Sequence, residues 1–345
     1  MLLKFTLARM EKDSTANSFK ELLTPLREKF PHPAWDFLEP FMTSYGAIIE
    51  RKGLDKAFYH NLLVSYGKFI VAQLKEPYKF GSFHEAIRSP IDYYQFGIDF
   101  FTPLIDFAKA TFTGKEHVEE IAQFIAKGDN VILYANHQIE ADPQVLSIFL
   151  KDSFPNLAKD MLFVAGERVV TDPLAVPFSL GCNLFCVFSK KYFEVHAERK
   201  AEMLEQNKRT MLHIAHHLHE GGKCIYIAPS GGRDRPNPDN PKEINLAAFD
   251  QQSIELLYLL GRKAKKKTHF YPLALKTHDL LPPPNKLQIS LGEKRIAKEA
   301  PVHIAFGQEI AMEDFPQSAT REEIKEARTE RIWSLVRAMY ETFPK

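Results

Sequence analysis

The sequence predicts an α/β protein with a mixed, largely buried sheet flanked by helices, and a smaller all-helical N-terminal domain. Two observations predict this fold. From about residue 115 onward the chain alternates between amphipathic helices and short, wholly apolar strands, whereas the first eighty residues carry helical patterns. Strands that are apolar on both faces are typical of a sheet covered by helices on both sides. In such folds the loops after the strands gather at one edge of the sheet and carry the chemistry.

The N-terminal residues are predicted to form helices. Ser18 and Glu21 have the spacing of a capping box, in which each side chain satisfies a free amide at a helix start. Apolar residues then recur at helical spacing, at Phe19, Leu22, Leu23, Leu26 and Phe30. A second amphipathic pattern predicts a helix over 56–74, which stops before Pro77.

A change of composition marks the predicted domain boundary. The stretch 77–103 is rich in aromatic residues and is interrupted by glycines and prolines, so we interpret it as a connection. We therefore predict a helical domain at 1–80 and an α/β domain at 81–345.

The α/β domain is predicted to repeat the order helix, glycine, strand and polar loop. The helix at 116–127 ends at Gly128, which suits the left-handed conformation that closes many helices. An apolar strand at 131–135 and a helix entered through Pro143 come next. The other expected elements are strands at 161–165, 184–188, 224–228 and 269–275, and a long helix at 197–220.

Composition excludes several classes of protein. The chain has 345 residues, of which 45% are hydrophobic and 26% charged, as in ordinary globular proteins and unlike disordered or fibrous ones. Lysine and arginine number 45 against 44 acidic residues, so no bulk charge draws the chain to nucleic acid or anionic lipid. We therefore expect no nucleic-acid partner and at most peripheral membrane contact.

Cysteine usage and the N-terminus bear on the compartment. The three cysteines are odd in number and lack the spacing of paired zinc ligands, which indicates a reducing compartment. The first residues lack a secretory apolar region, and no stretch reaches the roughly 18 apolar residues of a membrane span. We expect a cytoplasmic protein, or a plastid stromal protein if the sequence is a mature form.

The loop after strand 131–135 carries the first candidate site, in the residues NHQIEADP. His137 and Asp142 can meet there by hydrogen bond, so that the carboxylate orients the imidazole and raises its basicity, as a general base requires. The alternative is that Asp142 only caps the helix that begins at Pro143. Asp142 can also serve both purposes.

The loop after strand 224–228 carries the second candidate site, in the residues PSGGRDRP. Two glycines allow a sharp turn, and Arg233 and Arg235 present planar, permanently charged groups that bind phosphate bidentately. The alternative is a solvated turn in which the arginines pair with Asp234 and Asp239. Two further cations, Lys190 and Lys191, follow strand 184–188.

Two other patterns predict no site of this kind. His213, His216 and His217 have a spacing that fits zinc, but no third-ligand motif accompanies them, so we predict no metal. The four lysines at 263–267 are interpreted as a solvated helix end, with a docking patch for an acidic partner as the alternative.

Taken together, these motifs resemble the soluble, plastid-type glycerol-3-phosphate acyltransferases, a branch of the His-x4-Asp acyltransferase superfamily. The resemblance covers roughly residues 75–295. It rests on the segments EPYKFGSFHEAIRSPIDYYQFG, VILYANHQIEADP, AGERVVTDPLAVPFSLGCNL, FSKK, IAPSGGRDRP and YPLALKTHDLLPPP. The combination of NHQIEADP with IAPSGGRDRP is specific to this branch, whereas the N-terminal eighty residues match poorly.

The resemblance implies a function and site residues. His137 corresponds to the family's general base and Asp142 to its partner, and Lys191, Arg233 and Arg235 correspond to the phosphate-binding residues. Tyr192 stands where the family usually has His, and it is kept as a binding residue that adds no charge. The implied reaction transfers an acyl group from a thioester, expected to be acyl-acyl carrier protein or acyl-CoA, to the sn-1 hydroxyl of glycerol 3-phosphate. This is the first step of phospholipid synthesis, and no cofactor is implied.

Other functions fit the sequence less well. A non-catalytic acyl-carrier or lipid-binding module would not need both loops intact. Lysophosphatidate acyltransferases commonly carry a Phe-Pro-Glu-Gly loop and are membrane-bound, and neither feature is present here. A phosphatase would need a nucleophile or a metal cluster, and a thioesterase would release thiol without an acceptor.

Overall fold

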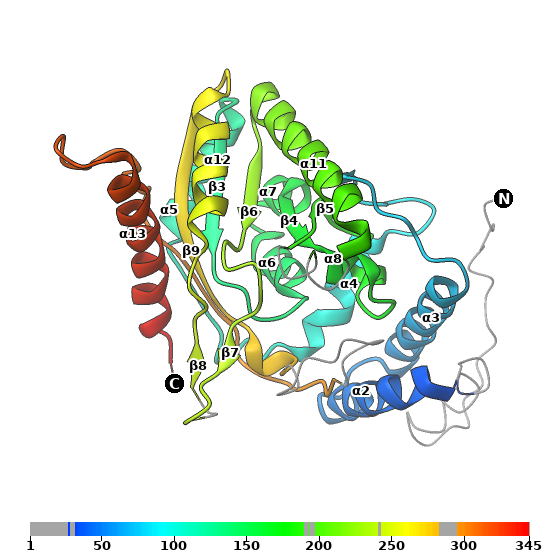
Figure 1. The fold of residues 1–345 in the computed structure, drawn as a ribbon. Coiled ribbons are helices and arrows are strands. Elements are labelled where there is room, and N and C mark those ends of the chain that lie inside the picture. Colours follow the sequence, from blue (N-terminus) through cyan, green and yellow to red (C-terminus); the bar gives the residue numbers. More distant parts are fainter. Residues whose placement is uncertain are drawn as a thin grey trace.

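The computed structural model of the protein describes residues 27, 32–189, 193, 197–240, 243–282 and 295–344 (Figure 1). The capping box predicted at Ser18 and Glu21 lies outside these residues, as do the apolar positions predicted for the first helix. The helices that bear on the site are α2 (His32–Arg51), α3 (Lys56–Lys75), α4 (Tyr93–Phe101), α5 (Lys115–Ala126), α6 (Asp142–Leu150), α8 (Glu167–Thr171), α9 (Val176–Ser179), α11 (Lys200–Glu220), α12 (Gln251–Lys263) and α13 (Arg321–Glu341).

A mixed, eight-stranded sheet forms the centre of the molecule. In sheet order its strands are β1 (Phe83–His84), β5 (Asn183–Val187), β4 (Leu162–Gly166), β6 (Cys224–Ile227), β3 (Asn130–Ala135), β9 (Thr268–Lys276), β10 (His303–Phe306) and β2 (Thr111–Thr113). The five strands from β5 to β9 are parallel, whereas β1 runs antiparallel to β5, and β10 runs antiparallel to β9 and parallel to β2. The predicted fold class is therefore confirmed.

Both faces of the sheet are buried, because alternate residues of each central strand enter two different cores. In β3, Val131 and Leu133 pack with apolar residues of α2, α3, α4, α5 and α6. Ile132 and Tyr134 point to the other face, where they pack with α11, α12 and α13. Every residue of β3 is buried, which explains the wholly apolar strand in the sequence.

Most predicted elements of the α/β part are present, with ends shifted by one or two residues. Helix α3 and strands β3, β4, β5, β6 and β9 match their predictions. The interpretation of 77–103 as a connection is wrong in part, because helix α4 forms within it. Asp92 caps α4 by accepting the amides of Tyr94 and Gln95, and Phe96 and Phe100 are buried. Among the described helices, none is both long and apolar enough to cross a bilayer.

Helices α2 and α3 share an apolar core with the α/β part (Figure 1). The hydroxyl of Tyr45 donates to the carbonyl of Phe100 at 2.9 Å, and that of Tyr66 donates to the carbonyl of Leu174 at 2.9 Å. The rings of Tyr66, Phe100 and Phe178 also contact one another. The domain boundary at residue 80 stays a prediction.

The parallel strands deliver their following loops to one edge of the sheet. Strands β6, β3 and β9 are adjacent in the middle of the sheet. Residues 228–234 follow β6, residues 136–142 follow β3, and residues 277–280 follow β9. Hereafter residues 136–142 are called the histidine loop and residues 229–236 the arginine loop. Both predicted loops therefore lie at the carboxyl edge of the strands, where α/β folds bind ligands.

Candidate active site

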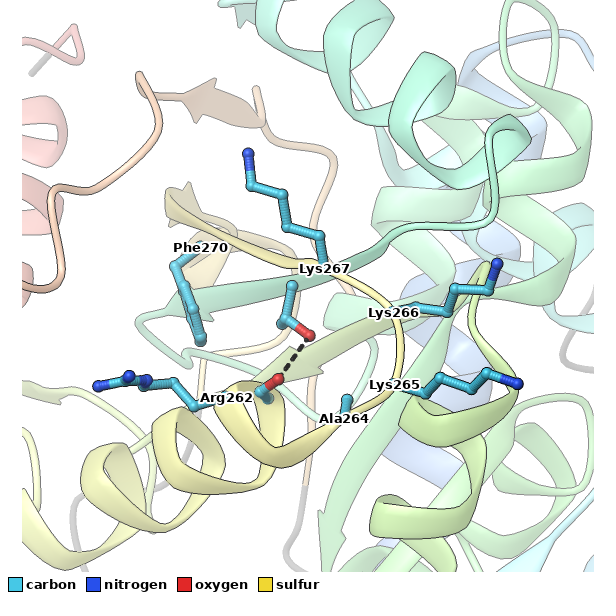
Figure 2. Close-up of a pocket in the computed structure, with 8 residues that line it drawn as sticks. Arg262, Ala264, Lys265, Lys266, Lys267 and Phe270 are labelled. Carbon is cyan, nitrogen blue, oxygen red and sulfur yellow. Dashed lines mark hydrogen bonds between the residues drawn. The ribbon is translucent and has the colours of Figure 1, made fainter.

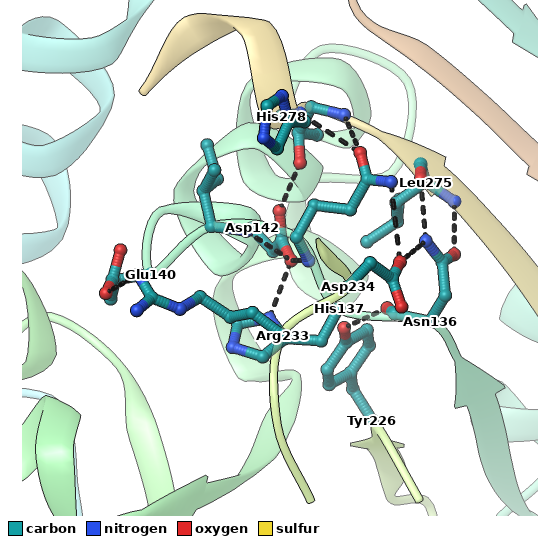
Figure 3. Close-up of polar contacts among 12 residues, drawn as sticks. Asn136, His137, Glu140, Asp142, Tyr226, Arg233, Asp234, Leu275 and His278 are labelled. Carbon is teal, nitrogen blue, oxygen red and sulfur yellow. Dashed lines mark hydrogen bonds and ion pairs between the residues drawn. The ribbon is translucent and has the colours of Figure 1, made fainter. Parts of the chain in front are cut away.

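His137 and Asp142 form a hydrogen bond at the carboxyl edge of β3 (Figure 3). His137 Nδ1 lies 2.8 Å from Asp142 Oδ2. The Asp142 side chain is buried, whereas 24% of the His137 side chain is exposed. The bond fixes the imidazole by its Nδ1 edge, so Nε2 is the ring nitrogen that remains for chemistry. The structure thus brings together the pair that the sequence predicts.

Asp142 is held by three further donors. The amide of Gln138 donates to Oδ2 at 2.9 Å and that of Ile139 at 3.4 Å, and the hydroxyl of Thr277 donates to Oδ1 at 2.6 Å. Ala141, not Asp142, occupies the cap position of α6, and Asp142 is the first helical residue. The interpretation of Asp142 as a helix cap is therefore wrong, since its carboxylate bonds backward into the loop. These bonds orient it toward His137.

Asn136 and Gln138, the neighbours of His137, tie the histidine loop to the end of β9. Asn136 Nδ2 donates to the carbonyl of Leu275 at 2.8 Å, and Asn136 Oδ1 accepts the amide of Leu275 at 2.8 Å. Gln138 Oε1 accepts the amides of Thr277 at 2.8 Å and His278 at 3.0 Å. Both side chains are buried and make bonds on either side of His137. They hold the histidine in place from two directions.

Asp234 joins the histidine loop to the arginine loop (Figure 3). Its amide donates to the carbonyl of His137 at 2.6 Å. Its carboxylate is buried and accepts Asn136 Nδ2 at 2.8 Å and the amide of Ala247 at 2.9 Å. Burial raises the pKa of Asp234 to about 6, against the effect of these hydrogen bonds. The predicted ion-pairing partner of the arginines is thus engaged by neutral amide donors.

Arg233 is buried and pairs with Glu140 of the histidine loop. Its Nη1 donates to Glu140 Oε1, and only 6% of its side chain is exposed. Gly231 before it has φ of +62°, the left-handed conformation that the two-glycine pattern predicts for a sharp turn. The cation predicted to bind phosphate therefore lies next to the His137–Asp142 pair, accompanied by a carboxylate.

Arg295 completes this group and was not predicted from the sequence. Its Nη2 lies 2.7 Å from Glu140 Oε1 and 2.7 Å from Oε2, and its Nη1 donates to the carbonyl of Leu281 at 3.3 Å. Burial alone would raise the pKa of Glu140, but the guanidinium groups of Arg295 and Arg233 hold it at about 2. A single arginine 155 residues beyond Glu140 leaves no local pattern in the sequence that could have indicated the contact.

The remaining predicted residues are placed less fully. Arg235 begins the short strand β7 (Arg235–Pro236) and pairs in register with Asn245 of β8 (Ile244–Asn245). Lys190, Lys191 and Tyr192 lie outside the described residues. Their predicted roles therefore stay predictions.

Metal and thiol chemistry find little support among the described residues. No group of three or more His, Cys, Asp or Glu side chains there could hold a metal ion. His217 Nδ1 lies 2.8 Å from the carbonyl of His213, and His216 lies 3.3 Å from Glu220. The three cysteines are free and buried, and burial raises the pKa of the Cys182 and Cys186 thiols to about 12.

Comparison with known proteins agrees with this geometry. The acyltransferase family model matches residues 109–304, a span that contains both loops. A mixed sheet that carries a His-Asp pair beside the buried Arg233 at the carboxyl edge of its parallel strands, matched by this family model, defines the chain as an acyltransferase.

Two curated relatives specify the family further. The chain is 34% identical over 342 residues to the chloroplastic glycerol-3-phosphate acyltransferase ATS12 of Cucurbita moschata, covering 96% of this chain and 74% of that protein. It is 36% identical over 289 residues to a chloroplastic glycerol-3-phosphate acyltransferase of Arabidopsis thaliana, covering 83% of this chain and 62% of that protein. The chain belongs to the glycerol-3-phosphate acyltransferase family.

A solved structure is also similar in outline. The 1-acyl-sn-glycerophosphate acyltransferase of Thermotoga maritima covers 79% of this chain and 88% of its own, with 17% identity and a TM-score of 0.40. A likeness this low carries no argument about function.

Proposed function

We propose that this protein transfers an acyl group from a thioester to the sn-1 hydroxyl of glycerol 3-phosphate. The observation that carries the proposal is the juxtaposition of a His-Asp pair with a buried arginine. The amide of Asp234, the residue after Arg233, donates to the carbonyl of His137 at 2.6 Å. A substrate that offers a hydroxyl to His137 and an anion to Arg233 matches this arrangement. The names of the two relatives support the same substrate.

His137 is proposed to act as the general base. Its Nε2 takes the proton of the sn-1 hydroxyl as the oxygen attacks the thioester carbonyl. Asp142, through its bond to Nδ1, holds the ring in the required tautomer and stabilises the imidazolium that forms. The thiolate of the donor then leaves and receives the proton from His137. Because His137 activates the acceptor alcohol directly, no covalent acyl-enzyme is required.

The buried cysteines support direct transfer. A cysteine nucleophile acts as the thiolate, which a raised pKa makes scarce at neutral pH. Burial raises the pKa of Cys182 and Cys186 to about 12, and burial also raises that of Cys224. None of these thiols is suited to carry the acyl group.

The phosphate of the acceptor is proposed to bind Arg233 and Arg235, with Lys191 as a further cation and Tyr192 as a neutral donor. A phosphate monoester carries about −1.5 to −2 charges at neutral pH, so several cations are needed to balance it. The arginines add direction to this charge because each guanidinium presents a planar fork of donors. Binding of the phosphate in the loop bonded to the carbonyl of His137 orients the acceptor for attack.

The hydrogen bonds already present exclude some backbone amides as donors to the oxyanion. The amides of Gln138 and Ile139 donate to Asp142, and that of Gly231 donates to the carbonyl of Ala228 at 3.2 Å. An oxyanion requires donors that are free to face it. These three amides are therefore poor candidates.

The donor is proposed to be acyl-acyl carrier protein, with acyl-CoA as the alternative. The lysines of 263–267 were considered as a docking patch, and three of them, Lys265, Lys266 and Lys267, line a hollow of about 340 Å³ where α12 ends and β9 begins (Figure 2). Strand β9 runs parallel to β3 from this end toward Thr277, which contacts Asp142. The length of β9, about 30 Å, therefore separates these lysines from His137 and Asp142. This argues against the docking interpretation and favours the solvated one.

The proposed compartment rests on the names of the relatives rather than on the sequence alone. Their names, which include the word chloroplastic, support the plastid alternative over the cytoplasmic prediction. Acyl-acyl carrier protein is the donor to test first for that reason.

The test is a direct assay of acyl transfer. The purified protein is incubated with acyl-acyl carrier protein or acyl-CoA, with and without glycerol 3-phosphate, and both free thiol and lipid product are measured. We expect thiol release that depends on glycerol 3-phosphate and a product acylated at sn-1. Thiol release without acceptor would indicate a thioesterase, and no release with either donor would support a non-catalytic module.

A further inference from the structure

We infer that Arg295 is a positioning residue for the acceptor site, acting through Glu140 to leave the charge of Arg233 available to the phosphate. The inference rests on the proposed function and adds a residue to it. It starts from an apparent conflict, since the arginine proposed to bind phosphate already pairs with a carboxylate.

Charge arithmetic gives Arg295 its first effect. Arg233 and Glu140 alone sum to zero, so a phosphate approaching them meets no net attraction and the repulsion of Glu140. Arg295 contacts both oxygens of Glu140 at 2.7 Å and returns the group to +1. All three side chains are at least three-quarters buried, so solvent screens these charges weakly.

The negative charge that Arg295 neutralises, on Glu140, is present at every working pH. The pKa of Glu140 is held at about 2, so the carboxylate stays charged at any working pH and needs a cation. A second carboxylate, Asp172, follows α8 and feels the charges of Arg168, Glu140 and Arg295, although burial has the largest effect and raises its pKa. Arg295 therefore balances a group of carboxylates that would otherwise oppose an anionic substrate.

Geometry gives Arg295 its second effect. A β-carbon placed at Gly231 or Gly232 would meet no atom within 4 Å, so no neighbouring side chain packs against that side of the turn before Arg233. Glu140 supplies a fixed acceptor for the Arg233 guanidinium. Arg295, bonded in turn to the carbonyl of Leu281 at 3.3 Å, fixes Glu140 from the other side. The chain of contacts runs from Leu281 through Arg295 and Glu140 to Arg233.

The test measures glycerol 3-phosphate binding by calorimetry without donor, and KM and kcat with acyl-acyl carrier protein. We expect Arg295→Ala to weaken acceptor binding and raise its KM about 10- to 100-fold, with kcat and donor KM nearly unchanged. Arg295→Lys should recover part of the loss because it keeps the charge. Lys298→Ala, an exposed change on the same segment, is the matched control and should match wild type.

The double variant Glu140→Gln with Arg295→Ala decides the mechanism. If Arg295 acts through Glu140, removing the carboxylate should restore most of the binding that Arg295→Ala loses. The double variant should then lie within about threefold of Glu140→Gln alone, since coupled residues give non-additive effects. This comparison also remains valid if Arg295→Ala fails to fold, because the double variant leaves no unbalanced buried carboxylate.

Two results would overturn the inference. One is an unchanged acceptor affinity in a folded Arg295→Ala protein. The other is a further tenfold loss in the double variant relative to Glu140→Gln, which would make Arg295 a direct phosphate ligand. If the wild-type protein itself does not acylate glycerol 3-phosphate, the proposed function fails instead.

Discussion

The histidine loop and the arginine loop lie side by side, yet they are held in different ways. In the histidine loop, His137 and Asp142 are five residues apart in the sequence, and the two backbone amides that donate to Asp142 belong to the same turn. In the arginine loop, Arg233 depends on Glu140, which lies 93 residues away in the sequence. Local bonds can be inferred from spacing, whereas the partners of a buried cation are chosen by the tertiary fold. Four predictions test this contrast.

The largest expected effect is on the histidine loop. His137→Ala should lower kcat about 10²- to 10⁴-fold, because the general base is removed. The melting temperature should change little, since the imidazole is partly exposed and, among the described residues, bonds only to Asp142. His216→Ala, with 68% of its side chain exposed, is the matched control. Near-normal turnover of the His137 variant would remove the proposed mechanism.

Asp142→Asn should lower kcat about 10²-fold by freeing the imidazole to adopt other orientations. Unlike the His137 variant, it should also destabilise the fold, by about 1–3 kcal/mol. The reason is that a buried carboxylate with four donors around it is replaced by an amide that cannot accept them all. Kinetics and urea unfolding measured on the same preparation check this, and unchanged kcat with lowered stability would leave Asp142 a purely structural role.

The arginine loop should respond through acceptor affinity rather than kcat. Arg233→Ala or Arg235→Ala should raise KM for glycerol 3-phosphate roughly 10- to 150-fold, since a charge-assisted hydrogen bond is lost. Lysine at either position should recover only part of this, because it lacks the planar fork. Both alanine variants should also discriminate less between glycerol 3-phosphate and glycerol.

Arg209→Ala, an exposed change on α11, serves as the control for these variants. An unchanged KM for glycerol 3-phosphate in both alanine variants contradicts the phosphate assignment. In that case the arginines serve stability, and the His137–Asp142 pair remains with its acceptor unknown.

The smallest expected effect concerns Asp234, where the two loops meet. Its pKa is raised by burial to about 6, so the folded protein binds this proton more tightly than the unfolded chain does. Its contribution to the free energy of unfolding is therefore fully present below about pH 4 and is lost as pH rises through about 6. The stability of wild type relative to Asp234→Asn should fall by about 2 kcal/mol between pH 4 and pH 7. Urea unfolding at both pH values measures this, and an unchanged difference between the two proteins would contradict the prediction.

The sequence by itself determined the layers of the fold and the reacting pair. Apolar runs such as β3 and β9 predict buried parallel strands because both of their faces must leave water. The alternation of strand and loop then places residues 136–142 and 229–236 at one edge of the sheet. His137 and Asp142 meet because they share a single turn, so their spacing was sufficient. Spacing did not decide whether Asp142 also caps the helix, since the choice of its carboxylate between forward and backward amides depends on how that turn closes.

Only the tertiary structure decided the surroundings of these residues. Thr277 reaches Asp142 across 135 residues, and Arg295 reaches Glu140 across 155. The periodicity of the sequence does not predict such contacts, because they depend on which strands become neighbours in the sheet. The partners of Glu140 were likewise not predictable: in the sequence it is one acidic residue in a polar loop, but in the structure it lies between the guanidinium groups of Arg233 and Arg295. Long-range electrostatics acts between groups that the fold brings together, and the net charge of the acceptor site is therefore a property of the folded protein alone.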